Sequence, residues 1–169
     1  MFYTAAGSLK QLRKQVTSIR TFAQLPEPQL YASSPVSAWT PSEHLDHLIR
    51  VCTSIVELLL DPAARPLSRK INVIGRVILH AGRIPRGRAA APKQFIAERT
   101  ATAQLLASLD ALEMAIARIP IADIPKRTDA TVKHPRFGGL TPSQALRFVA
   151  IHNDHHLRII ADMLKGDDR

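Results

Sequence analysis

The sequence contains the run Ile151-His152-Asn153-Asp154-His155-His156-Leu157, inside a segment that we expect to form one continuous helix. Residues four apart in a helix lie on the same face, about one turn from each other. His152 and His156 can therefore direct two imidazoles toward one point. A second pair, His44 and His47, lies far upstream on another expected helix. This arrangement predicts a metal site between two helices of a bundle.

Spacing alone leaves the third ligand open. His44 and His47 are three residues apart and flank the apolar stripe of their helix, which consists of Leu48, Cys52, Ile55 and Leu59. Either of these two histidines could face the interior. The histidines of both helices could also be core residues that make ordinary hydrogen bonds. His155 lies toward the edge of the stripe on its own helix. His80 and His134 have no partner at metal-ligand spacing, so we expect structural roles for both.

Helical periodicity covers most of the chain. We expect helices over residues 8–25 with Ser8 as N-cap, from 41 to the stop at Asp61-Pro62, and over 68–83, 92–118 and 141–165. TPSE (residues 40–43) and TPSQ (residues 141–144) each combine an N-cap residue, a proline at the first helical position and a capping-box residue. We interpret residues 119–140, which contain three prolines, as an extended crossing loop. These features predict an all-α four-helix bundle with long connections and one short extra helix, in a single domain over residues 1–169.

Composition indicates an ordinary globular protein. The 169 residues include 46% hydrophobic and 22% charged residues, which is enough for one hydrophobic core. We find neither the apolar run of a secretory signal nor the roughly eighteen apolar residues that a membrane span needs. The single cysteine, Cys52, excludes an internal disulfide and fits a reducing cytoplasm, where we expect the protein to be. Because Cys52 lies in an apolar helical run, we interpret it as a core residue.

The chain carries a formal net charge of +9, and its cationic residues are densest between residues 65 and 93. Such a charge can attract nucleic acid or an anionic ligand. Aromatic residues make up only 5% of the chain, and none is interleaved with those cations as a stacking platform for nucleic acid would require. We therefore favour a solvated surface. Binding of an anionic small molecule or partner is the main alternative, and nucleic-acid binding is the least favoured.

Three short motifs resemble those of the DinB-like superfamily. WTPSEHLDH (residues 39–47) is similar to the W-[ST]-P-x-E-x-x-x-H start of that superfamily's second helix, and HNDHH (residues 152–156) is similar to the H-x-x-H-H signature on its last helix. HPRFGGLTP (residues 134–142) resembles an uncharacterised branch in which H-P-x-F-G-x-L-T-P leads into that helix. The motifs occur in the expected order along the chain.

The resemblance implies a DinB-like four-helix bundle in which His47, His152 and His156 hold a divalent metal ion, while His44 and His155 occupy non-ligand positions. Known members include thiol-dependent transferases and isomerases that use low-molecular-weight thiols, and many others have no established activity. Three neutral imidazoles leave a coordination position open for water or a thiolate. Imidazole-rich sites suit zinc and nickel, which we expect first, and also iron or copper.

The expected function is therefore that of a metal-dependent thiol S-transferase or hydrolase acting on a small molecule. The alternative is a non-enzymatic module in which the metal holds the bundle together and the basic surface binds an anionic partner. We expect a small-molecule substrate as a partner, and a low-molecular-weight thiol is one candidate. A second copy of the chain, in a homodimer, is a further expected partner. Glu43, Asp46, Arg50 and Asp154 could orient ligands or substrate, but we favour surface or ion-pair roles for them.

Overall fold

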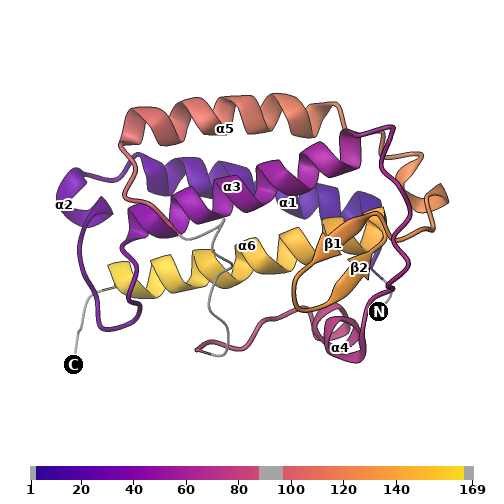
Figure 1. The fold of residues 1–169 in the computed structure, drawn as a ribbon. Coiled ribbons are helices and arrows are strands. Elements are labelled where there is room, and N and C mark those ends of the chain that lie inside the picture. The colour runs from indigo at the N-terminus through magenta and orange to yellow at the C-terminus, as the bar shows by residue number, and fades with distance from the viewer. Residues whose placement is uncertain (1–2, 88–96, 166–169) are drawn as a thin grey trace.

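The computed structural model describes residues 3–87 and 97–165. Its four long helices, α1 (Ala5–Ala23), α3 (Pro41–Leu60), α5 (Thr102–Ala117) and α6 (Pro142–Leu164), pack as a bundle (Figure 1). The connections contain two short helices, α2 (Glu27–Leu30) and α4 (Val73–Ala81), a 3-10 turn η2 (Ile124–Lys126) and two strands, β1 (Val132–His134) and β2 (Gly138–Leu140). The prediction of a four-helix bundle is confirmed, although the described residues contain two short helices where one was predicted.

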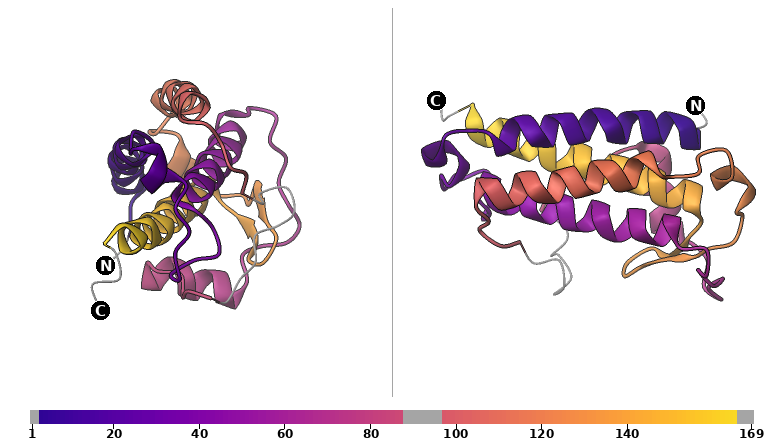
Figure 2. Two further views of the ribbon diagram at one scale, coloured as in Figure 1. Left: turned by 90° about the vertical axis from the view of Figure 1, so that its left-hand side faces the viewer. Right: turned by 90° about the horizontal axis from the view of Figure 1, so that it is seen from above.

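The order of the helices is not that of a simple up-and-down bundle. Both α1 and α3 pack against α5 and α6, as the end-on view in Figure 2 shows. In Figure 1, α1 and α6 run in one direction, whereas α3 and α5 run in the other. Because α3 and α5 are parallel, the chain between them must return along the bundle, and it forms α4 on the way. The predicted long connections follow from this topology.

Matching capping motifs determine where α3 and α6 begin. The Thr40 hydroxyl accepts a hydrogen bond from the Glu43 backbone N–H at 3.3 Å, and the Glu43 carboxylate accepts one from the Thr40 N–H at 2.7 Å. Thr141 and Gln144 repeat this exchange at 3.3 and 3.0 Å. Loss of such a cap typically costs about 0.5–2 kcal/mol. The two helices that carry the histidine motifs therefore begin at positions set by local sequence.

The interior of the bundle is aliphatic. Fully buried side chains come from all four long helices and include Leu12, Ile19, Leu45, Leu48, Leu105, Leu109, Leu112 and Leu146. Burial of each such side chain contributes about 1.5–3 kcal/mol. Gln15 is a polar exception on α1, and its Nε2 donates to the Ala150 carbonyl oxygen of α6 at 2.7 Å. Within the described ranges, no helix is both long and apolar enough to cross a membrane.

Three predicted helix starts are wrong. Helix α1 begins at Ala5 with Thr4 as its N-cap, and Ser8, the predicted cap, is buried inside the helix. Helix α4 is shorter than the predicted helix over residues 68–83, because it begins only after Asn72, whose side chain caps its first turn. The residues before Asn72 pair with the hairpin instead of continuing the helical hydrogen bonds.

The helix predicted over residues 92–118 also begins later, at Thr102. Residues 92–96 lie outside the described residues, and residues 97–101 are not helical. The sequence period there is compatible with a helix, so the reason for the difference must lie in contacts with another part of the chain.

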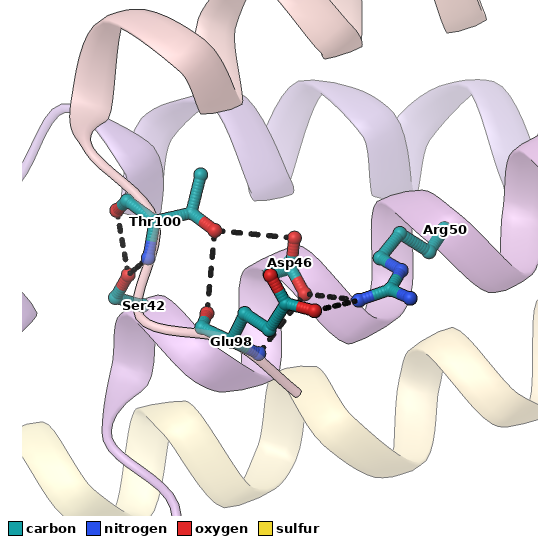
Figure 3. Close-up of polar contacts among 5 residues, drawn as sticks. All are labelled: Ser42, Asp46, Arg50, Glu98 and Thr100. Atoms are coloured by element: carbon teal, nitrogen blue, oxygen red, sulfur yellow. Dashed lines mark hydrogen bonds and ion pairs between the residues drawn. The ribbon is translucent and has the colours of Figure 1, made fainter. Parts of the chain in front are cut away.

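Those contacts are with α3 and are drawn in Figure 3. The Ser42 hydroxyl donates to the Thr100 carbonyl oxygen at 2.8 Å and accepts from the Thr100 N–H at 3.1 Å. The Asp46 carboxylate accepts from the Glu98 N–H at 3.1 Å and from the Thr100 hydroxyl at 3.2 Å. Arg50 bridges the Asp46 and Glu98 carboxylates at 3.4 and 3.3 Å. The segment's backbone groups thus find partners on α3 rather than within a helix.

The predicted loop over residues 119–140 contains a hairpin that the sequence analysis did not predict. Strands β1 and β2 are antiparallel, with Val132 opposite Leu140 and His134 opposite Gly138. Strands of three residues are too short to show a reliable alternation of polar and apolar side chains, and glycine is uncommon in strands. The hairpin contacts α3 and α6, so it brings His134 to the side of the bundle.

Candidate metal centre

Four histidines from α3 and α6 gather between these two neighbouring helices. His44 and His47 lie in the first turns of α3, whereas His152 and His156 lie in the middle and second half of α6. Because the two helices are antiparallel, these portions face each other (Figure 1). His47, His152 and His156 each offer one ring nitrogen, and these nitrogens all lie within 4.8 Å of one another.

The distances fit a shared divalent ion. The Nε2 atoms of His47 and His152 are 3.1 Å apart. At a tetrahedral zinc ion with Zn–N bonds of about 2.0–2.1 Å, two ligand nitrogens lie about 3.3–3.4 Å apart. This pair therefore already has the spacing of two ligands of one ion. The full group, within 4.8 Å, is wider, so an ion would draw the rings closer together.

His44 joins the cluster from a position that the resemblance assigns to a non-ligand. Its Nδ1 lies 2.9 Å from Nδ1 of His156, and its Nε2 lies 2.9 Å from the Ser37 hydroxyl oxygen. The same Ser37 oxygen accepts a hydrogen bond from the Trp39 backbone N–H at 3.1 Å. His44 thus connects the loop before α3 to His156. Sequence reasoning missed this contact, because spacing showed only that His44 flanks an apolar stripe.

The indole of Trp39 covers one side of the cluster. Its ring centroid lies 5.3 Å from that of His44 and 5.1 Å from that of His47. It also stacks on His156, with 6.1 Å between centroids and 14° between ring planes. The sequence analysis used Trp39 only as part of a helix-start motif. Its position directly before the Thr40 cap was the signal that it would lie against the first turn of α3.

Burial favours the neutral form of the His44, His152 and His156 imidazoles. His47 and His152 are only 4% and 9% exposed. Burial, assisted by repulsion from neighbouring imidazolium charge, lowers the pKa values of His152 and His156 well below the ordinary range. The same causes lower the pKa of His44 to about 4. Since a metal ion binds the deprotonated ring nitrogen, burial favours the ligand form at neutral pH.

The remaining histidines lie at the edge of the group or outside it. The ring centroid of His155 is 5.0 Å from that of His156, and burial lowers the pKa of His155 as well. His134 lies in β1, where its Nδ1 accepts two backbone hydrogen bonds from the hairpin turn at 3.2 and 3.1 Å. His80 is exposed in the last turn of α4. The hydrogen bonds of His134 agree with the structural role expected of it, and the role expected of His80 stays a prediction.

The charged residues near the motifs have structural partners, as the sequence analysis favoured. Glu43 completes the cap of α3, and Asp46 holds the segment before α5 together with Arg50. Asp154 pairs with Arg158 one turn later in α6 at 2.7 Å.

Cys52 is a core residue, as predicted. Its thiol is fully buried, donates to Oδ1 of Asn153 at 3.2 Å and accepts from Nδ2 of the same amide at 3.1 Å. Burial raises the pKa of Cys52 to about 12. The thiol is therefore protonated at neutral pH and does not act as a nucleophile. Asn153, which the sequence analysis did not single out, directly follows His152 and links α6 to α3.

Comparisons with known proteins agree with this architecture. A model of the DinB superfamily matches residues 9–160, a range that includes both histidine-bearing helices. The crystal structure of TT2238, a four-helix bundle protein, is similar over 94% of this chain and 98% of that chain, with a TM-score of 0.57 and 22% sequence identity. At this identity the likeness shows the fold alone. No curated protein matches the sequence.

Proposed function

Since this chain belongs to the DinB superfamily, we propose that it binds a divalent transition metal through His47, His152 and His156. The observation that carries this proposal is the convergence of three ring nitrogens within 4.8 Å, and burial lowers the pKa values of two of these rings, those of His152 and His156. A set of imidazole nitrogens favours zinc or nickel over magnesium or calcium, which prefer oxygen ligands.

The proposed activity is that of a thiol S-transferase or a hydrolase acting on a small molecule. Three protein ligands leave at least one coordination position for an exogenous group. A divalent metal lowers the pKa of a thiol or a water molecule bound at this position and so supplies a nucleophile at neutral pH. The three protein ligands are neutral, so the ion would keep its double positive charge. This charge favours an anionic fourth ligand such as a thiolate or hydroxide.

Other residues of the chain orient the proposed metal ligands and shield them from water. His44 contacts Nδ1 of His156, which leaves Nε2 of His156 for the ion. The Trp39 indole limits the access of water to the side of the cluster that it covers. Both residues act on the ligands, so their proposed role is to hold the imidazoles in one arrangement before an ion or a substrate arrives.

A second candidate function is that of a non-enzymatic binding module. In this case the metal connects α3 to α6, and the basic surface binds an anionic partner. The observation that favours this candidate is that the buried His47 and His152 belong to α3 and α6, so an ion that both bind would join the two helices and stabilise the fold.

Metal analysis of the purified protein tests both candidates together. The expected result is about one equivalent of metal in the wild-type protein and none in His152→Ala, while the far-UV helical signal of the variant largely remains. His80→Ala, which changes an exposed histidine outside the cluster, should retain the metal. Full metal occupancy in His152→Ala would refute the assignment of the site.

Two further measurements separate the enzyme from the module. The first compares thermal unfolding with and without a chelator, and the second follows the consumption of a low-molecular-weight thiol with an electrophilic aryl halide. Thiol consumption that needs the metal and is lost in His152→Ala supports the transferase. A large loss of stability on chelation, without any thiol reaction, supports the structural role instead.

A further inference from the structure

A basic cavity lies on the outside of the bundle, away from His47, His152 and His156. It has a volume of about 450 Å³ and lies between the segment leading into α4 and the β1–β2 hairpin. Cationic side chains enter its lining from both sides: Arg69 and Lys70 from the segment, and Lys133 and Arg136 from the hairpin. Among the described residues that line it, none is acidic. The formally charged residues that line the cavity are therefore all cationic, which favours an anionic ligand.

The walls of this cavity are held together by backbone contacts. Lys70 pairs with Gly139 of β2, and the Asn72 backbone N–H donates to the Phe137 carbonyl oxygen at 2.8 Å. The Asn72 side-chain amide donates to the Arg136 carbonyl oxygen at 2.7 Å. A Cβ atom at Gly138 would lie only 2.6 Å from the Lys70 carbonyl oxygen, so the two backbones meet where there is no room for a side chain. Backbone contacts within the fold therefore hold the two walls of the cavity in place.

The four cations have no carboxylate partner in the part of the chain that the structure describes. Other arginines do have one: Arg20 pairs with Asp110 at 2.7 Å, and Arg86 pairs with Asp162 at 2.6 Å. The described residues contain no such pair for Arg69, Lys70, Lys133 or Arg136. Like charges around one cavity repel each other, and an anion placed between them would offset that repulsion.

We propose that this cavity binds a phosphate-bearing anion. Arginine binds phosphate oxygens through two parallel N–H donors, and lysine adds a compact charge, so two of each match a dianionic or more highly charged group. The volume of about 450 Å³ lies in the range of small-ligand pockets and exceeds what inorganic phosphate alone needs. The cavity therefore has room for an organic part of the ligand beside the phosphate. The site does not depend on the proposed metal function.

The same phosphate chemistry has two sources, a soluble phosphate ester and the headgroup of an anionic lipid. A lipid is considered because apolar side chains are exposed beside the cavity. Helix α4 begins directly after Asn72, which lines the cavity, and it exposes Val73, Ile74 and Val77. Figure 1 shows α4 and the hairpin together at the outside of the bundle. The experiment must therefore include an arm for each source.

Calorimetry with sodium pyrophosphate as the probe, at constant ionic strength, tests the site. Arg69→Gln with Lys133→Gln removes one cation from each wall, and the affinity should fall at least about tenfold, because charge-assisted hydrogen bonds to the phosphate are lost on both sides. The matched control, Arg13→Gln with Lys14→Gln, removes the same charge from the exposed face of α1 and should bind as the wild type does. Equal weakening in both pairs, or no binding by the wild type, would overturn the proposal.

Further arms keep the test independent of folding and of the metal. Lys70→Gln with Arg136→Gln is a second pair from the same cavity and should weaken binding similarly if the first pair fails to fold. His152→Ala, which lies outside the cavity, should still bind pyrophosphate even when it has lost the metal. The lipid arm measures co-sedimentation with phosphatidylglycerol vesicles and with phosphatidylcholine vesicles. If the protein co-sediments only with phosphatidylglycerol vesicles, and pyrophosphate releases it, the site is supported with a lipid as the source of the phosphate. Pyrophosphate binding without co-sedimentation supports it with a soluble ester.

Discussion

The Nδ1 atoms of His44 and His156 lie 2.9 Å apart, so one imidazole donates a hydrogen bond that the other accepts. If His156 donates from Nδ1, its Nε2 is the deprotonated nitrogen with a lone pair for a metal ion. The second nitrogen of His44 contacts the Ser37 hydroxyl at 2.9 Å, and this contact limits rotation of the His44 ring. His44 is therefore placed to select the tautomer and the orientation of His156.

His44→Ala should weaken metal binding without abolishing it. Loss of a partner that orients a metal-bound histidine typically lowers affinity about 10–100-fold. Competition with a chromogenic chelator measures this change, and His80→Ala on α4 is the control that should bind as the wild type does. Wild-type affinity in His44→Ala would show that the contact does not position His156. A loss as complete as that of His152→Ala would make His44 a ligand.

The contrast between His44 and the other three histidines shows what the sequence can predict. The i, i+4 spacing of His152 and His156 follows from helix geometry, and the Thr40 and Thr141 caps locate both helices. The contact from His44 to His156 depends on how α3 and α6 are aligned along each other and on the His44 rotamer. Neither is encoded in local periodicity, so the resemblance could only mark His44 as a non-ligand.

Errors in the predicted elements have a similar origin. Residues 97–101 have the composition of a helix, but hydrogen bonds to Ser42 and Asp46 replace the helical ones. Lys70 pairs with Gly139 of the hairpin, and the Asn72 N–H donates to the Phe137 carbonyl oxygen, so α4 begins only at Val73. Both segments form non-local contacts, which override propensity in short stretches. The four long helices, whose apolar faces are several turns long, were predictable for the opposite reason.

His134 should make the metal-free protein less stable as the pH falls. Burial, assisted by the nearby charge of Arg136, lowers the pKa of His134 to about 4, whereas an unfolded histidine titrates near 6.5. Between these values the unfolded state binds more protons than the folded state, so the free energy of unfolding decreases from about pH 6.5 down to about pH 4. Above pH 6.5 this group contributes no pH dependence.

Urea unfolding in the presence of chelator at pH 7 and pH 5 measures this effect. His134→Asn keeps an oxygen acceptor for the two backbone N–H groups of the turn but has no titratable ring. Its loss of stability over this interval should be smaller than that of the wild type, by up to about 1.4 kcal/mol per pH unit. An identical pH dependence in the two proteins would show that His134 titrates normally.

Cys52 should not react with thiol reagents in the native protein. Its side chain is fully buried, and burial raises its pKa to about 12, so neither access nor thiolate is available near pH 8. Labelling with a disulfide reagent should be negligible in buffer and should reach one thiol per chain in denaturant, since the sequence contains 1 cysteine. Native labelling at the rate of a free thiol would mean that the contact between α3 and α6 at Asn153 opens readily.

Gly139 should be the residue of the hairpin least tolerant of a side chain. A Cβ atom there would meet the Arg69 carbonyl oxygen and would lie 2.9 Å from the Ala130 side chain. Because a backbone oxygen cannot rotate away, Gly139→Ala must separate the hairpin from the segment that leads into α4. We expect a loss of about 1–3 kcal/mol in the free energy of unfolding, as is usual when a packed site receives extra volume.

Urea unfolding checks this expectation, with Gly7→Ala as the control. Among the described residues, an added Cβ at Gly7 would meet only the Thr4 hydroxyl, at 3.0 Å. This hydroxyl caps α1, so crowding of the cap opposes the higher helix propensity of alanine, and the stability loss should be smaller than that of Gly139→Ala. Gly139→Ala should also weaken pyrophosphate binding, because Arg69 and Lys133 lie on the two walls that move apart. Unchanged stability in Gly139→Ala would show that the two walls are not held in contact, and the basic cavity would lose the rigid frame on which its anion site depends.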